Sequence, residues 1–290
     1  MTEPEFATAI AARGHRAVDP LHSLSYFVPE TEQKLTEAGL RPGRMCYFAG
    51  RSAAMGAVTA AVVTATFYNF DPGLVRRHIP RAWTLASPAD ILAARLEAVD
   101  LALRRLLGAD LIGSAEVAEA AVLARRATEA CGPEGRPLFA AHAELDWPGP
   151  PHLQLWHAIT LLREHRGDGH LAALLGQHLN GIDAIVSHTA TGRGFLEPAA
   201  KALRGWSNED WAASVRRLQD RGLLDDAGSG LTQQGSALRA RLEADTDELA
   251  SAPWRRLGVA DSQRLTDLGK SLSRLVVAAG AFPAGVFAQR

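Results

Sequence analysis

The sequence has little that would mark a disulfide-stabilised, metal-binding or strand-rich protein. Its two cysteines, Cys46 and Cys131, lie far apart and lack CxxC or metal-ligand spacing. We interpret both as reduced core thiols of a cytoplasmic protein. Only 6% of the residues are aromatic and β-branched residues are sparse, which disfavours extended sheets.

An excess of charge and the common cofactor motifs are also absent. The chain has 31 basic and 32 acidic residues, and a net charge of -1 does not indicate a polyanion-binding or membrane-surface protein. No GxGxxG after a strand, no GxxxxGK[ST] and no GxSxG is present. No HExxH set is present either, and the spacing of His165, Asp168 and His170 is loose for a metal site. We therefore expect no nicotinamide, flavin, ATP or metal cofactor.

No segment at the start of the sequence has the pattern of a secretory signal. The most apolar stretch, residues 53–70, is bounded by Arg51 and Asp71 and is only mildly hydrophobic. We interpret residues 52–68 as one buried core helix and not as a membrane span.

What the sequence does contain is alanine and leucine, within a hydrophobic share of 47%, which predicts a helical protein with a well-buried core. The clearest helix covers 87–108, where Ser87 is an N-cap, Pro88 the first helical residue and Gly108 the stop. Similar signals predict helices over 29–40, 71–83, 114–132, 182–190 and 261–280.

A proline- and glycine-rich stretch over 132–154 is the best linker candidate. We place a boundary near 145–152, which divides the chain into an N-terminal helical half, 1–150, and a C-terminal half, 151–290. After the boundary we expect a helix over 153–165 and a second over 169–179, with Asp168 as the N-cap of the second.

Residues 207–250 contain a capped helix that ends in DRGLL, the polar turn DDAGSG and another helix. A helix, a short β-hairpin and a helix in this order are typical of a winged helix-turn-helix. The predicted fold class is therefore all-α, in two helical halves, of which the second is winged-helix-like with one short β-hairpin.

The stretches FAGRSAAMGAV, ATFYNFDPGLVRRHIPRAW, LWHAITLLREHRGDGHLAAL and RLQDRGLL carry a family resemblance. The sequence resembles an actinobacterial family of mostly helical proteins that are labelled helix-turn-helix or winged-helix-like. The resemblance covers most of the chain and implies a fold. It brings no settled activity and no catalytic residues, and a fold does not determine a function.

The charge balance argues against DNA binding by the second half. Residues 201–256 contain nine basic and nine acidic side chains, whereas a DNA reader must neutralise phosphates. The candidate recognition helix, 207–221, begins with Asn208, Glu209 and Asp210, where base-contacting residues usually lie. Arg216, Arg217 and Arg221 form at most a small basic patch.

The sequence LLREHRGDGH, 161–170, concentrates charge in an otherwise apolar region. We predict that His157, Glu164 and His165 supply acid–base groups. Arg163, Arg166 and His170 would bind an anionic substrate. The alternative is structural, with Glu164 paired to an arginine and Asp168 used only as a cap.

Arg51, Tyr68 and Asn69 lie in or beside the predicted 52–68 helix and its exit. They are further candidate substrate-binding residues, which would complete a pocket with the helix that carries His157. The alternative is that Tyr68 and Asn69 only fix the turn before Asp71 by hydrogen bonds.

Our leading hypothesis is a cytoplasmic small-molecule enzyme of specialised metabolism. It would use cofactor-independent acid–base chemistry, by elimination, cyclisation or hydrolysis, on an anionic substrate. The alternatives are a ligand-responsive winged-helix DNA-binding regulator and a non-catalytic small-molecule-binding or partner protein. No membrane partner is expected, and the sequence is compatible with a homo- or hetero-oligomer.

Overall fold

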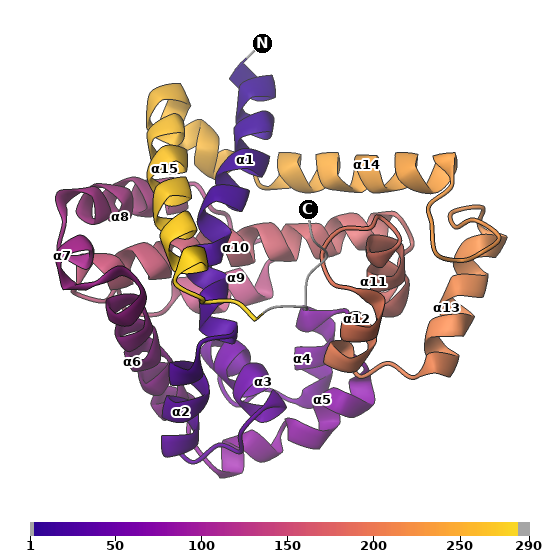
Figure 1. Cartoon of the computed structure of the whole chain (residues 1–290), viewed down its shortest axis with the longest axis horizontal. Coiled ribbons are helices and arrows are strands. Elements are labelled where there is room, and N and C mark those ends of the chain that lie inside the picture. The colour runs from indigo at the N-terminus through magenta and orange to yellow at the C-terminus, as the bar shows by residue number, and fades with distance from the viewer. Residues whose placement is uncertain (1–2, 284–290) are drawn as a thin grey trace.

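A computed structural model of the chain describes residues 3–283, and these form fifteen α-helices and no β-strand (Figure 1). The predicted all-α class is confirmed. The first nine helices are α1 (Glu3–Ser23), α2 (Pro29–Glu37), α3 (Arg44–Ser52), α4 (Ala60–Phe67), α5 (Pro72–His78), α6 (Pro88–Leu107), α7 (Ala109–Ile112), α8 (Ala115–Thr128) and α9 (Pro137–Ala143). The others are α10 (Pro151–Gly176), α11 (Gly181–Thr189), α12 (Glu197–Arg204), α13 (Asn208–Asp220), α14 (Gln233–Leu249) and α15 (Ala252–Ala278).

Several helices begin and end where the sequence has a capping residue next to the helix. Ser87 accepts a hydrogen bond from the backbone N–H of Asp90, Pro88 opens α6, and Gly108 ends it with a φ of 81°. These features confirm the prediction for 87–108. The hydroxyl of Ser207 caps α13 in the same way, by accepting from the N–H of Asp210. An N-cap of this kind contributes about 1 kcal/mol.

The prediction of two helices over 153–165 and 169–179 is wrong, because α10 runs without interruption from Pro151 to Gly176. Asp168 caps a different helix: its Oδ2 accepts from the backbone N–H groups of Leu138, 3.0 Å away, and Phe139, 2.9 Å away, at the start of α9. Each glycine inside a helix costs about 1 kcal/mol. Burial of α10 on nearly all sides outweighs this cost.

The predicted helix over 52–68 is also wrong as a single element. The chain forms α3 and a 3-10 turn over Ala53–Met55, and then α4 at a bend of 93°. Gly56 takes the left-handed region at a φ of 79°, and Thr59 caps α4 by accepting from the N–H of Val62. Within residues 3–283, no single helix is long and apolar enough to cross a membrane, and α3 and α4 meet that length and composition only as a bent pair.

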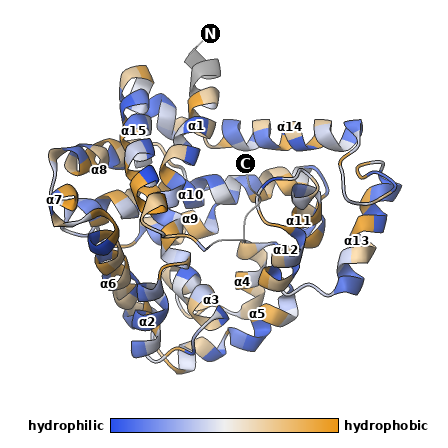
Figure 2. Ribbon diagram, in the orientation of Figure 1, coloured by the Kyte–Doolittle hydropathy of each residue, from blue (hydrophilic) through white to orange (hydrophobic). Residues whose placement is uncertain are grey.

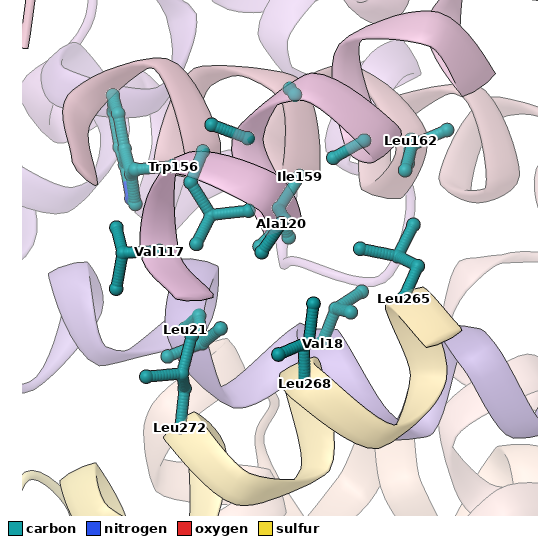
Figure 3. Packing of buried hydrophobic residues seen from close by; sticks show 14 of the residues in the cluster. Val18, Leu21, Val117, Ala120, Trp156, Ile159, Leu162, Leu265, Leu268 and Leu272 are labelled. Atoms are coloured by element: carbon teal, nitrogen blue, oxygen red, sulfur yellow. The ribbon is translucent and has the colours of Figure 1, made fainter. Parts of the chain in front are cut away.

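The largest core cluster joins α1, α6, α8, α10 and α15 (Figure 3). Val18 and Leu21 of α1, Ile159 of α10 and Leu265 and Leu268 of α15 are among its buried members. The cluster therefore contains residues from both sides of the predicted boundary at 150. The division into 1–150 and 151–290 stays a prediction, but this core cluster crosses it. We refer to α1–α10 and α15 together as the body.

A second cluster lies under α2–α6, and a third holds α11–α13 to the C-terminal end of α10 and to α14. The third includes Leu174 of α10, Ile185 of α11, Trp211 and Leu218 of α13 and Leu242 of α14. Helix α14 then leads back to α1 and α10 (Figure 1). Hydrophilic and hydrophobic residues alternate along the peripheral α13 and α14 (Figure 2), as expected for helices with one exposed face.

The predicted β-hairpin is not formed in the part of the chain that the structure describes. Between α13 and α14 the only pairing is an isolated antiparallel bridge of Leu224 with Leu231. The intervening turn is instead held by Asp225, whose N–H donates to the carbonyl of Gly230, 3.0 Å away, and whose carboxylate accepts from the N–H of Ser229, 3.1 Å away. A turn rich in glycine, serine and aspartate disfavours the extension of this pairing into strands.

Candidate functional site

A cavity of about 520 Å³ lies where α1, α3, α4 and α10 of the body face α11, α12 and α14. This volume is within the range of about 300–1,000 Å³ that small-molecule sites occupy. Six arginines line it, against three carboxylates, which belong to Asp19, Asp168 and Glu243. The arginines are Arg16, Arg51, Arg163, Arg166, Arg204 and Arg239. The wall therefore carries an excess of positive charge. A smaller cavity of about 230 Å³ shares Tyr47 and Arg51 with it.

Glu164 organises part of this wall from behind. Its side chain is fully buried and accepts hydrogen bonds from Arg51 Nη2 at 2.9 Å, Arg51 Nε at 3.3 Å and Arg163 Nη1 at 3.1 Å. Burial alone would raise the pKa of Glu164, but Arg51 and Arg163 hold it well below its ordinary value. Glu164 is therefore an ionised counter-charge that orients two arginines, which agrees with the structural alternative for this residue.

The other two predicted catalytic residues lie outside the cavity. His157 is 4% exposed and packs edge-on against Trp147, with ring centroids 4.7 Å apart. His165 contacts the ring of Phe139, and its carbonyl accepts a hydrogen bond from Arg136. Burial lowers the pKa of both imidazoles to about 4, so both are neutral at pH 7. The structure does not bring His157, Glu164 and His165 together, and the geometry does not favour their predicted role.

All six predicted substrate-binding residues line the one cavity. They are Arg51, Tyr68, Asn69, Arg163, Arg166 and His170. Several also make the structural contacts that were the alternative. The Tyr68 hydroxyl donates to the carbonyl of Leu179 at 2.5 Å, and the Asn69 carbonyl accepts from Trp206 Nε1 at 3.0 Å. Their roles in ligand binding stay a prediction, whereas their common location is a finding.

The remaining contacts neutralise most of the positive wall. Arg163 also pairs with Asp19 at 3.2 Å, Arg166 with Asp247 at 2.7 Å, and Arg239 with Glu243 at 3.1 Å. His170 Nδ1 lies 2.9 Å from the Thr246 hydroxyl of α14. The Arg166–Asp247 pair and the His170–Thr246 contact link α10 to α14, whereas Arg163–Asp19 links α10 to α1 and Arg239–Glu243 lies within α14.

Sequence reasoning missed several cavity residues, of which Tyr47, Arg204 and His15 matter most. Burial would raise the pKa of the Tyr47 phenol, but the charges of Arg51, Arg204 and Arg163 lower it below its ordinary value. Burial lowers the pKa of His15 to about 4. No local pattern links these residues, because they come from three helices that are far apart in sequence.

The segment α12–α13 has the form of two helices joined by the three-residue turn 205–207. Gly205 takes the left-handed region at a φ of 77°, as a glycine in such a turn commonly does. Of the predicted basic patch, Arg217 pairs with Asp183 at 2.7 Å. Arg221 donates to the carbonyls of Gln177 and His178. Arg216 is exposed.

Within residues 3–283 the structure places no three histidine, cysteine, aspartate or glutamate side chains where they would hold a metal ion.

Fold and cavity together define an all-helical protein with a two-helix turn unit beside an arginine-lined cleft. The model of a helix-turn-helix family matches residues 11–283, and the chain belongs to that family. No curated protein and no solved structure matches the chain.

Proposed function

We propose that the protein is a ligand-responsive helix-turn-helix regulator. The cleft binds a small organic anion, and the α12–α13 unit binds DNA. The single observation that carries the proposal is the position of the arginine-lined cavity, whose wall includes Arg204, the last residue of α12 before the turn to α13.

The ligand half of the proposal is supported by the excess of arginine in the cavity wall. Guanidinium groups bind carboxylates and phosphates through paired hydrogen bonds. The cavity is also lined by apolar and aromatic side chains, including Phe67, Phe70 and Phe195. A ligand with an anionic group on a flat apolar body matches both features.

The DNA half is supported by family membership and by the two helices joined at Gly205. The electrostatics limit it. The exposed first turn of α13 carries Glu209 and Asp210, and Arg217 is already paired with Asp183. We therefore expect few phosphate contacts, about three. The logarithm of the binding constant should then decrease with the logarithm of the salt concentration with a shallow slope of about -3.

DNA binding is tested by selecting duplexes from a random pool with the purified protein and measuring the selected sequences by fluorescence anisotropy. Enriched sequences that bind in a salt-dependent manner would support the proposal. Arg216→Ala should weaken this binding, whereas Arg13→Ala, which removes an exposed arginine of α1, should leave it unchanged. A pool that shows no enrichment refutes the DNA half and leaves the ligand half to stand on its own test.

Ligand binding is tested by calorimetric titration with small aromatic anions, each beside a neutral analogue of the same shape. Binding of the anions and not of the neutral analogues is expected. Equal binding of both forms, or of neither, would contradict an anion site.

A cofactor-independent acid–base enzyme is the second candidate, because His15, His170 and Asp168 line the same cavity. Burial lowers the pKa of both histidines to about 4 and raises that of Asp168 to about 6. At pH 7 both imidazoles are neutral and Asp168 is mostly ionised, so all three would act as proton acceptors. Mass spectrometry of a bound ligand after incubation separates the candidates: an enzyme converts it, whereas a regulator returns it unchanged.

A further inference from the structure

Arg204 differs from the other arginines of the cavity in having no counter-charge. Arg51, Arg163, Arg166 and Arg239 each pair with a carboxylate, and Arg16 is exposed to solvent. Within the described part of the chain, Arg204 has no carboxylate within ion-pair distance. Its buried Nε has no hydrogen-bond partner there either.

Aromatic rings hold the Arg204 side chain at the cavity wall. Its guanidinium carbon lies 4.4 Å from the centroid of the Phe70 ring and 5.0 Å from that of Phe195. Stacking of this kind fixes the plane of a guanidinium and leaves its N–H groups at the edge to meet an oxyanion. An anion that enters the cavity therefore meets an oriented and unneutralised cation at this point.

Tyr47 supplies a second donor beside Arg204. Its side chain lines the same cavity, and its ring centroid lies 5.4 Å from that of Phe70, the ring on which Arg204 stacks. Its hydroxyl makes no hydrogen bond to any residue between 3 and 283. The phenol lies within the electrostatic influence of Arg51, Arg163 and Arg204. A phenol O–H and a guanidinium together match a carboxylate or a phosphate.

Arg204 is also the last residue of α12, directly before the turn that leads to α13. Its carbonyl accepts a hydrogen bond from the N–H of Asp71 at 2.9 Å. On the other side of Gly205, Trp206 Nε1 donates to the carbonyl of Asn69 at 3.0 Å. The segment 68–71, which forms part of the cavity wall, is thus bonded to both ends of the turn.

We propose that Arg204 and Tyr47 bind the anionic group of the ligand, and that an anion held by Arg204 immobilises the turn between α12 and α13. This inference rests on the proposed ligand site and adds the binding residues and the route to the helix-turn-helix unit. The ligand is an oxyanion, carboxylate or phosphate, carried on an aromatic body. The bound anion restrains the end of α12 from one side, while segment 68–71 holds the turn from the other.

The test uses the full chain with phenyl phosphate, benzoate and neutral benzamide as probes. Calorimetry measures binding, and hydrogen–deuterium exchange measures protection of the turn and the first residues of α13, residues 205–211. Phenyl phosphate and benzoate distinguish a phosphate from a carboxylate ligand. The wild-type protein should bind at least one of the two and show slower exchange in the turn.

Three variants locate the site. Arg204→Met should weaken binding of the anion roughly tenfold or more, the effect of losing a hydrogen bond to a charged group. Arg204→Lys, which keeps the charge but not the planar fork, should fall between this variant and wild type. Arg13→Met on the exposed face of α1 is the control for loss of one positive charge, and its affinity should equal that of wild type.

Trp206→Phe separates binding from transmission, because Trp206 does not line the cavity. It should retain anion binding while losing most of the added protection of the turn. If the wild-type protein binds none of the anions, the proposed ligand site itself fails. If it binds them and Arg204→Met binds equally well, the site stands and the assignment of Arg204 is overturned. Binding without any change of exchange in the turn overturns the transmission.

Discussion

Replacement of Arg204 by methionine should stabilise the protein while it removes anion binding. Burial lowers the pKa of Arg204 to about 10; Tyr47 opposes this effect, and the charges of Arg44, Arg51 and Arg163 add to it. At 1.36 kcal/mol per pH unit, the charged form is less favourable here than in water by about 3 kcal/mol. Contacts with the rings of Phe70 and Phe195 return about 1–2 kcal/mol.

The difference predicts that Arg204→Met raises the free energy of unfolding by about 1–2 kcal/mol, because methionine fills a similar volume without the charge. For a chain of 290 residues the melting temperature should rise by roughly 2–3 °C. Urea denaturation followed by circular dichroism measures the free energy, with Arg13→Met as the control, expected within about 0.5 kcal/mol of wild type. A loss of stability of more than about 1 kcal/mol in Arg204→Met would refute the reasoning and make Arg204 a structural residue.

Three further predictions concern the body of the protein. Glu164→Gln leaves Arg51 and Arg163 without their buried counter-charge. It should therefore lower the free energy of unfolding, measured in urea, by about 3–5 kcal/mol. A loss below about 1 kcal/mol would show that the two arginines find other partners. Gly181→Ala should destabilise by about 1–3 kcal/mol or more, because its Cβ would lie 2.0 Å from the carbonyl oxygen of Tyr68. Gly176→Ala meets no atom within 4 Å and is the matched control; it should be neutral or stabilising by up to about 1 kcal/mol, because alanine favours a helix over glycine. Lowering the pH from 6.5 towards 4 should destabilise the fold, because the unfolded chain then binds protons that the buried imidazoles do not. Each such histidine contributes about 1.4 kcal/mol per pH unit over this interval, and Asp168, with its pKa raised to about 6, opposes the trend. The urea concentration at the unfolding midpoint should therefore be lower at pH 5 than at pH 7. An unchanged midpoint would contradict the low pKa of the buried histidines. The histidines with a pKa of about 4 are His15, His142, His157, His165 and His170.

Local signals in the sequence predicted the helices whose ends are set by neighbouring residues. Ser87, Pro88 and Gly108 act within one turn of α6, so their effect can be read without the rest of the fold. The same reasoning failed at Asp168, which has the composition of a local cap but binds the N–H groups of α9, about thirty residues earlier. A side chain that caps a distant helix leaves no trace in the spacing of its neighbours.

The candidate site, too, could be predicted from the sequence only in part. Periodicity identified the polar residues near the buried stretch of α10, and six of the predicted binding residues do share one cavity. It could not separate the faces of a helix that is buried on nearly every side, so His157 was assigned to the site although it packs against Trp147. In the sequence, Arg204 is only one of the nine basic residues that balance nine acidic ones over 201–256. Its isolation from carboxylates is a property of the folded chain alone.

The chain passes from α10 through α11 into the α12–α13 unit and returns through α14 (Figure 1). Both α10 and α14 contact α1. The α12–α13 unit is therefore an internal segment, with helices that contact α1 before and after it in the sequence. Exchange of residues 181–232 between members of the family would transplant, as a block, the helices that we propose to bind DNA. That block includes Arg204 and Phe195, which line the cavity, so such an exchange would alter the proposed DNA-binding unit and part of the proposed ligand site together. If the proposed function holds, inheritance of this segment ties the ligand specificity of the protein to its DNA specificity.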